Sequence, residues 1–225
     1  MGNEASKTKQ IWGEFEKNLL KGEGIDIGCG PDPIMPNTIP FDMEDGDANE
    51  ISKYFDKQFD FVFSSHSLEH MHDPIEAIQE WWKLVKPGGH LIFVVPDEDL
   101  YEQGYFPSLF NEDHKSTFTI SKNTSWSPRS YNILELVTYL QDGQLLKIEL
   151  QDNNYKRSNL YHSVYSRENA YKGMSIARKV SSLFKVFGIR KSVNKFLCQV
   201  CRLPIDQTND EATAQISVII KKTHL

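Results

Sequence analysis

The stretch FDFVFSSHSLEHMHDPIEAIQEWWKLVKPGGHLIFVVP, residues 59–96, predicts a strand, a helix and a second strand in succession. Residues 59–64 are nearly all apolar, which is typical of a strand covered on both faces. Asp73 and Pro74 begin the helix, with proline at its first position, and a Pro-Gly-Gly sequence ends it. Residues 90–96 predict another buried strand. A crossover helix between two strands implies parallel pairing, so this unit predicts an α/β fold.

The flanking sequence extends the predicted sheet in both directions along the chain. Apolar residues recur at helical spacing in residues 10–20 and 130–140, which predicts a helix in each range. Residues 25–27 predict a short strand before the central unit, and residues 145–150 and 214–220 predict two strands after it. We expect one domain over the whole chain.

The overall composition is that of a globular protein of ordinary character. The chain has 225 residues, of which 39% are hydrophobic and 25% charged, and its net charge is −6, which does not favour nucleic acid as a partner. No apolar run is long enough to span a bilayer, and the first ten residues lack a signal-peptide core. Cys29, Cys198 and Cys201 do not suggest a disulfide framework, so the reducing cytoplasm is the expected compartment.

Residues 168–204, before the last predicted strand, form a basic insert. Apolar residues repeat at helical spacing on both sides of Gly188, which predicts two amphipathic helices. Three roles remain open: a lid and packing layer over the sheet, a homodimer contact, or contact with an anionic membrane or polyanion. Cys198 and Cys201 form Cys-x-x-Cys without a second ligand pair, which argues against zinc. The basic residues of the insert are Lys172, Arg178, Lys179, Lys185, Arg190, Lys191, Lys195 and Arg202.

The stretch GIDIGCGPDPIMPNTIPFDMEDGDANEI, residues 24–51, predicts a nucleotide-binding turn at Gly28 and Gly30. A dinucleotide site needs a third glycine and a helix N-terminus, but prolines follow this turn and its many acids would repel a pyrophosphate. The absence of a Gly-Lys-Ser/Thr sequence excludes a P-loop. S-adenosylmethionine, a cation without phosphate, suits the site better, and a carboxylate can accept from both ribose hydroxyls.

The segments IDIGCG, GDA, FDFVFSSHSLEHMHDP and LVKPGGHLIFVVP, in this order, resemble the motifs of class I, Rossmann-like S-adenosylmethionine-dependent methyltransferases. The resemblance runs from residue 22 to residue 96. It implies a mostly parallel sheet with an antiparallel last strand, and residues 22–150 would form the cofactor-binding core of the domain. Residues 97–130 resemble a bacterial subgroup linked to surface-polysaccharide and small-molecule modification. The intervals from Asp26 to Asp42 and from Asp42 to Asp47 are short for the family, so we expect abridged first helices and almost no third strand.

The same resemblance implies the cofactor contacts. Asp26 and the glycine turn would surround the methionyl part, Asp42 would bind the ribose, and Asp47 with Ala48 would meet the adenine. The division of labour between Asp42 and Asp47 stays open. The expected cofactor-binding residues are Asp26, Gly28, Cys29, Gly30, Asp42, Met43, Asp47, Ala48, Ser65 and His66, and the product would be S-adenosylhomocysteine.

Histidine is the default general base for an alcohol acceptor. His66, after a predicted strand, and His114, on the long loop region, are the catalytic candidates. The alternatives are a cofactor-pocket role for His66 and a loop-ordering role for His114, bonded to Glu112 or Asp113. A structural role is favoured for His70. The candidate substrate residues are Asp97, Tyr101, His114, Lys115 and Arg129.

Each of these substrate candidates also has a plainer interpretation. Asp97 could cap a helix, and Lys115 and Arg129 could form ordinary surface pairs. Asp113 with Asp97 or Asp99 could hold Mg²⁺, but carboxylates are abundant here, and we assign no metal site.

The expected function is transfer of a methyl group from S-adenosylmethionine to an oxygen of a small molecule, such as a sugar, a nucleotide-linked sugar or a polysaccharide precursor. The basic insert supports a rival reading as an RNA or protein methyltransferase. The shortened helices prompt another, a cofactor-binding module with a degraded catalytic site. The strand at residues 59–64 is followed by Ser-Ser-His rather than the Asn/Asp-Pro-Pro-Tyr type of signature of many nucleic-acid enzymes.

Overall fold

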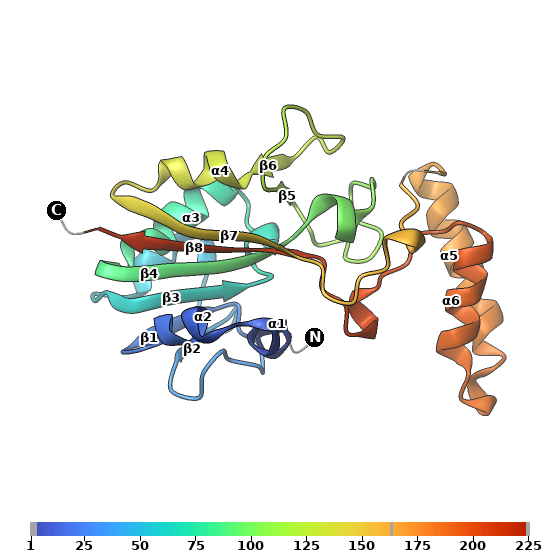
Figure 1. The fold of residues 1–225 in the computed structure, drawn as a ribbon, viewed down its shortest axis with the longest axis horizontal. Coiled ribbons are helices and arrows are strands. Elements are labelled where there is room, and N and C mark those ends of the chain that lie inside the picture. Colours follow the sequence, from blue (N-terminus) through green and yellow to red (C-terminus); the bar gives the residue numbers. More distant parts are fainter. Residues whose placement is uncertain (1–3, 163, 224–225) are drawn as a thin grey trace.

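The computed structural model describes residues 4–162 and 164–223, and its main sheet has six strands in the order β2-β1-β3-β4-β8-β7 (Figure 1). β1 pairs in parallel with β2 and β3, and β3 pairs in parallel with β4. β8 runs antiparallel to both β4 and β7, so the predicted mostly parallel sheet with an antiparallel last strand is confirmed. The strands are β1 (Gly24–Ile27), β2 (Ile39–Phe41), β3 (Phe59–Ser65), β4 (Val85–Pro96), β7 (Gly143–Gln151) and β8 (Gln215–Lys222).

Strand β3, helix α3 (Pro74–Lys83) and strand β4 form the predicted unit at the centre of the sheet. Asp73 caps the helix, because its Oδ1 accepts the backbone N–H of Ile75 at 2.8 Å. The apolar face of α3 buries Ile78 and Trp81 against the sheet. Removing these side chains from water is the main force that holds the helix on the sheet.

Helices cover both faces of the sheet (Figure 1). The larger core cluster, which includes Trp81, Phe93 and Leu136, lies on the face that carries α3 and α4 (Ile133–Leu136). A second cluster lies beneath the N-terminal helices on the other face, where the rings of Trp12 and Phe63 meet edge-on at 5.7 Å. The sheet is therefore the middle of three layers.

The prediction of one N-terminal helix over residues 10–20 is wrong in the extent of the helix. The chain forms two short helices there, α1 (Glu4–Ile11) and α2 (Glu14–Leu19). Glu16 explains the break, because its Oε2 accepts the backbone N–H of Gly13 at 2.9 Å and so caps a new helix start.

The helix predicted over residues 130–140 is also shorter than expected. The first three residues of this range form strand β6 (Ser130–Asn132), which pairs with β5 (Thr117–Thr119). Helix α4 and a 3₁₀ turn (Val137–Tyr139) follow. Pairing with a distant segment therefore replaces the first helical turn. Strand β4 begins before residue 90, at Val85, with a register shift opposite β3.

The expected abridgement of the first helices is confirmed. Residues 28–38 connect β1 to β2 through turns without a helix, as their prolines predict. Between β2 and β3 the described chain has only a kinked 3₁₀ stretch, η1 (Ala48–Tyr54), and no strand. β2 is therefore the edge of the sheet on this side.

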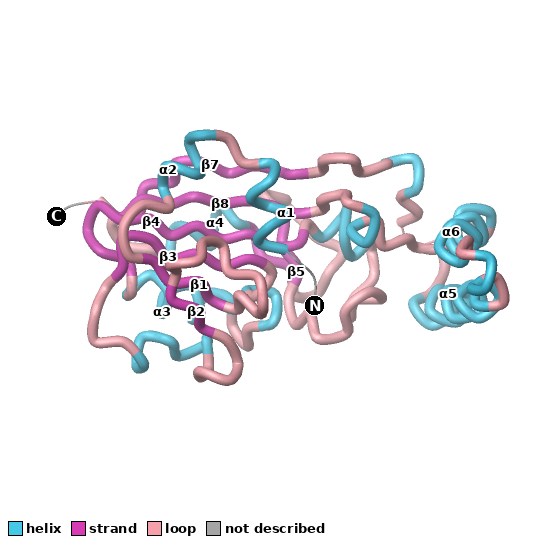
Figure 2. The backbone as a smooth tube through the Cα atoms, turned by 90° about the horizontal axis from the view of Figure 1, so that it is seen from below, coloured by secondary structure: helices cyan, strands magenta, loops and turns pink. Residues whose placement is uncertain are grey.

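The insert forms two helices, α5 (Arg167–Ser182) and α6 (Arg190–Val200), with Gly188 in the left-handed conformation between them (φ 70°). Figures 1 and 2 both show this hairpin beyond the carboxyl ends of the parallel strands, apart from the sheet. The interpretation as a packing layer over the sheet is therefore wrong. None of the helices in the described part of the chain is long and apolar enough to cross a membrane.

Candidate active site

A cavity of about 970 Å³ opens where the parallel strands end. Most residues that the sequence points to line it, and they come from four separate connections of the sheet. A second hollow of about 660 Å³ lies beside α3, and none of the expected site residues line it. The expected residues in the lining of the larger cavity are Asp26, Gly28, Cys29, Gly30, Asp42, Met43, Asp47, Ala48, Ser65, His66, Tyr101, His114 and Lys115.

The glycine turn requires its glycines. Gly28 and Gly30 both have positive φ, 72° and 52°. A Cβ atom on Gly28 would lie 1.9 Å from Ser67 Oγ, so no larger residue fits there. The backbone N–H of Gly28 donates to the carbonyl of Phe41 at 2.7 Å, which joins the turn to β2. The turn therefore brings bare backbone to the cavity wall.

Asp26 lies buried on β1, directly before this turn. Its Oδ2 accepts the backbone N–H of Ile34 at 2.7 Å, whereas its Oδ1 has no hydrogen-bond partner. Burial raises the pKa of the Asp26 carboxyl to about 7, and the charges of Asp32 and Asp42 add to the increase. A positively charged group in the cavity would favour the ionised form and satisfy the free oxygen.

Asp42 and Asp47 are attached to different parts of the site. Asp42 Oδ2 accepts the backbone N–H of Gly30 at 2.9 Å, which ties this acid to the glycine turn. Asp47 Oδ1 accepts both the backbone and the side-chain N–H of Asn49, at 2.9 and 2.7 Å. These hydrogen bonds hold the pKa of Asp47 below its usual value. The two carboxylates, close in sequence, therefore have separate anchors.

His66 follows β3 with a left-handed backbone (φ 56°), which is uncommon outside glycine and frequent at functional sites. Its Nε2 lies 2.9 Å from Gln215 Oε1, and its Nδ1 lies 3.4 Å from Glu69 Oε1. The neighbouring Ser65 hydroxyl is buried without a hydrogen-bond partner. The end of β3 thus offers an oriented imidazole and a free hydroxyl to a ligand.

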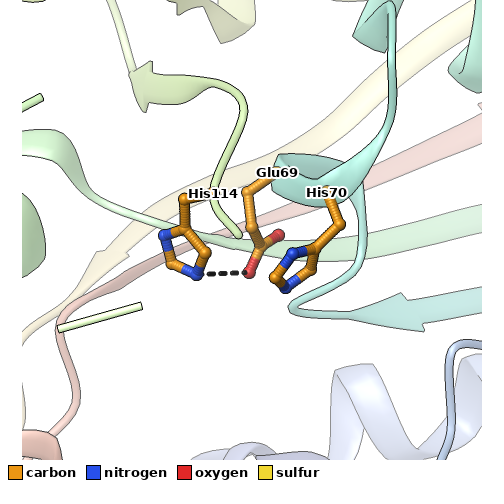
Figure 3. Close-up of side chains that lie close together, drawn as sticks. All are labelled: Glu69, His70 and His114. Atoms are coloured by element: carbon orange, nitrogen blue, oxygen red, sulfur yellow. Dashed lines mark ion pairs between the residues drawn. The ribbon is translucent and has the colours of Figure 1, made fainter. Parts of the chain in front are cut away.

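Glu69 is the centre of a buried charged cluster (Figure 3). Neither of its oxygens has a hydrogen-bond partner, and His114 Nε2 lies 3.9 Å from Oε1. Burial by itself raises the pKa of Glu69, but the contact with His66 and the charges of His66, His114 and His70 hold it below its usual value. An ionised carboxylate is therefore kept among three imidazoles.

His114 is held by a second buried carboxylate. Its Nδ1 lies 2.6 Å from Glu102 Oε1, and the Tyr101 ring stacks on the imidazole at 5.3 Å. The alternative pairing with a neighbouring loop acid is not made, because Asp113 contacts His70 at 2.9 Å instead. An imidazole oriented by a carboxylate can accept a proton, and the carboxylate stabilises the resulting cation.

Two residues expected at the substrate side do not line the cavity. Asp97 is buried and caps the π-helical turn η3 (Glu98–Glu102), because its Oδ1 accepts the backbone N–H of Leu100 at 3.0 Å. Burial raises the pKa of Asp97 to about 6. The Arg129 guanidinium donates to the carbonyl of His72 at 2.9 Å. These contacts give both side chains a part in holding the local structure, and their predicted role toward the acceptor stays a prediction.

One group of described residues could hold a metal ion. Glu69, His70 and His114 each offer an atom within 4.8 Å of the others. Nitrogen and oxygen ligands on one metal lie roughly 3 to 3.5 Å apart, closer than the 3.9 Å between Glu69 and His114. Asp97 and Asp99, which were considered as Mg²⁺ partners of Asp113 without being assigned, lie outside the cavity lining. The Glu69 and His114 atoms are therefore set slightly farther apart than two ligands of one metal ion.

Three residues of the site were missed from sequence: Glu69, Glu102 and Gln215. Glu69 stands beside His70 in the motif at residues 59–74, so a signal existed there. Glu102 and Gln215 have no local signal. Only the fold brings them to histidines that are 12 and 149 positions away.

A methyltransferase-domain family model matches residues 6–169, well over half of the chain, and the chain belongs to that family. The protein is an S-adenosylmethionine-dependent methyltransferase, with S-adenosylmethionine as its cofactor. No protein with a curated description matches the sequence.

Solved structures share the fold. A Bacillus halodurans C-125 protein, provisionally named a methyltransferase, has a TM-score of 0.51 at 14% identity, over 99% of this chain and 100% of that chain. The plantazolicin methyltransferase BamL, in complex with a triazolic desmethylPZN analog and SAH, has a TM-score of 0.50 at 11% identity, over 99% and 86%. At these identities the likeness concerns the fold alone.

The cavity fits the cofactor on its own chemistry. S-adenosylmethionine carries an ammonium and a sulfonium, and the buried, unpartnered Oδ1 of Asp26 is an acceptor for a cation. The glycine turn allows a ligand to approach the backbone closely.

Proposed function

We propose that the enzyme methylates a hydroxyl group of a small polar acceptor, namely a sugar, a nucleotide-linked sugar or a polysaccharide precursor. The observation that carries the proposal is the buried pair of His114 and Glu102, of which His114 lines the same cavity as the glycine turn. An alcohol is a poor nucleophile until it loses its proton, so O-methylation calls for such a base.

The cofactor side is formed by residues 26–48 and the end of β3. Asp26 accepts the ammonium of the methionyl part, and the turn around Cys29 packs along it. Asp42 and Met43 contact the ribose, and Asp47 and Ala48 contact the adenine. Ser65 and His66 border the sulfonium. When bound, S-adenosylmethionine supplies an electrophilic methyl group, and the protein contributes mainly by positioning the acceptor against it.

The acceptor side is formed around His114. In the proposed step, Nε2 of His114 accepts the proton of the acceptor hydroxyl, while Glu102 on Nδ1 holds the orientation of the ring and stabilises the imidazolium that forms. Removal of such a base costs roughly 100- to 10,000-fold in rate. His66, held by Gln215, is the second candidate for this step.

The lining near His114 supports a polyhydroxyl acceptor. Tyr101, Asn111 and Lys115 face the same cavity and offer hydroxyl, amide and ammonium groups. Lys115 is positioned by donating to the carbonyl of His70 at 2.7 Å. Several hydrogen-bonding groups around one imidazole suit a sugar ring better than an apolar acceptor.

The test is an acceptor screen with S-adenosylmethionine and free or nucleotide-linked sugars, with mass spectrometry to detect the gain of one methylene group. His114→Ala and His66→Ala are compared for turnover, and binding of S-adenosylhomocysteine is the control. The base variant loses turnover at neutral pH and keeps its affinity for S-adenosylhomocysteine. Methylation of amines alone, or full turnover in both variants, would overturn the proposal.

A further inference from the structure

The hairpin of α5 and α6 exposes large apolar side chains along its length. At its turn, Val186 is 92% exposed, Leu183 75% and Phe187 74%. Proteins that act as free monomers rarely leave so many large apolar side chains exposed on one element. The other exposed large apolar residues of the hairpin are Tyr171, Ile176, Val180, Ile189, Phe196 and Val200.

These side chains are not the interior of the hairpin. The two helices bury small residues, including Ala177 and Ser181 of α5 and Cys198 of α6. The base of the hairpin is anchored elsewhere, through a cluster that joins Met174 to Tyr105. The hairpin is therefore folded and attached without using the large apolar residues that it exposes.

The charge of the hairpin is opposite to that of the remainder. Residues 167–204 hold nine Lys and Arg residues and one acid, Glu168, for a net charge of +8. The chain as a whole has −6, so the remainder has −14. Lys185, Arg190 and Lys191 flank the apolar turn itself. Apolar and basic side chains are thus combined on one projecting element.

We propose that this hairpin docks on the surface of an anionic phospholipid membrane. Lys and Arg side chains would contact the headgroups, while the apolar residues around Phe187 enter the boundary of the acyl chains. The same surface would repel the acidic remainder, which orients the molecule with the hairpin toward the membrane. No spanning segment is needed, since the contact is peripheral.

Two other binding partners of the hairpin would satisfy only part of its exposed side chains. A second hairpin packed through the same residues would bring +8 against +8, which opposes association. A nucleic acid would neutralise the basic residues but would leave Val186, Leu183 and Phe187 without apolar contacts. A membrane interface satisfies both kinds of side chain.

Docking would also bring the cavity close to the membrane. The hairpin lies beyond the carboxyl ends of the parallel strands (Figure 1). Residues at these strand ends line the cavity, and the chain that leaves α6 adds Thr208, Ala212 and Thr213 to its wall. The docking surface and the catalytic site share no residue, so the proposal stands whichever acceptor is used.

The test measures flotation of the full chain with vesicles of neutral phosphatidylcholine and of phosphatidylcholine mixed with phosphatidylglycerol. We expect binding to the anionic vesicles alone, weakening as salt is added. One variant combines Leu183→Ser, Val186→Ser and Phe187→Ser, and another combines Lys185→Glu, Arg190→Glu and Lys191→Glu. Each reduces binding at least about tenfold, because each removes one of the two attractions.

A matched control variant changes exposed residues on α2 and just after it instead, with Phe15→Ser, Lys17→Glu and Lys21→Glu. It binds vesicles like the unaltered chain, and unchanged affinity for S-adenosylhomocysteine shows that every variant is folded. Equal binding to neutral and anionic vesicles, or none to either, overturns the proposal. So does a dimer, by light scattering, that only the hairpin variants abolish, or RNA binding without vesicle binding.

Discussion

Asp26 offers a sharp test of the cofactor site, because its carboxyl group is buried with one oxygen unpartnered. Burial raises the pKa to about 7 in the folded chain, from an ordinary value of 3.8. A carboxyl group with a raised pKa stabilises the fold while it is protonated, and that contribution is lost as pH rises through the folded pKa. Between about pH 5.5 and pH 8 the loss amounts to about 2 kcal/mol.

Asp26→Asn removes this titration and keeps an oxygen for the N–H of Ile34. Without ligand, we expect the free energy of unfolding of the variant, relative to the unaltered chain, to rise by about 2 kcal/mol between about pH 5.5 and pH 8. Urea denaturation at the two pH values measures it. A difference that stays constant with pH would refute the raised pKa.

Protonation of the Asp26 carboxyl group also lowers the affinity for the cofactor. Because the ionised carboxylate accepts the ammonium, the dissociation constant of S-adenosylhomocysteine is about thirtyfold larger at about pH 5.5 than at pH 8. Calorimetry on Asp26→Asn shows weak binding that does not change with pH. Asp47→Asn is the control for the pH dependence. Loss of the adenine contact lowers its affinity at both pH values, but the ratio between them stays that of the unaltered chain, because the pKa of exposed Asp47 is already low. An unaltered chain that binds equally at both pH values would refute the role of Asp26.

Three further variants test the site and its scaffold. Glu102→Gln lowers kcat by about 10- to 100-fold, because the neutral glutamine side chain no longer stabilises the His114 cation. The affinity for S-adenosylhomocysteine is unchanged, and a loss of that affinity would contradict this role. Gly28→Ala lowers the free energy of unfolding by about 2–4 kcal/mol, and Ser67→Gly restores part of it, as denaturant titration would show. Trp81→Phe removes the Nε1–H bond to the Ala48 carbonyl and costs about 1–2 kcal/mol in the same measurement; no loss would mean that the bond is not formed.

The parallel half of the sheet was predictable because its signals are local. Apolar runs mark β3 and the later part of β4, and Asp73 with Pro74 marks the start of α3. In the same way, the prolines of residues 28–38 predicted that no helix forms there. Local composition also sufficed to predict the two helices of the insert.

What sequence reasoning missed depends on contacts across the fold. The break between α1 and α2 comes from the Glu16 cap on Gly13, and β6 exists because it pairs with β5. Asp97 stands after a strand like a ligand-binding acid, but a helix cap has the same local sequence. Glu102 becomes part of the site only where the loop places it on His114.

The residues that line the cavity come from two parts of the chain, one inside and one outside the segment that matches the family model. Thr208, Thr213 and Gln215 line the cavity but lie beyond residue 169, where the family match ends. The segment that carries them can be lengthened, shortened or replaced without touching the glycine turn. This part of the wall can therefore change while Gly28, Cys29 and Gly30 stay the same. A chimera that receives residues 152–214 from a related enzyme should keep its cofactor affinity, and its choice of acceptor would show how much this part of the wall adds to Tyr101, His114 and Lys115.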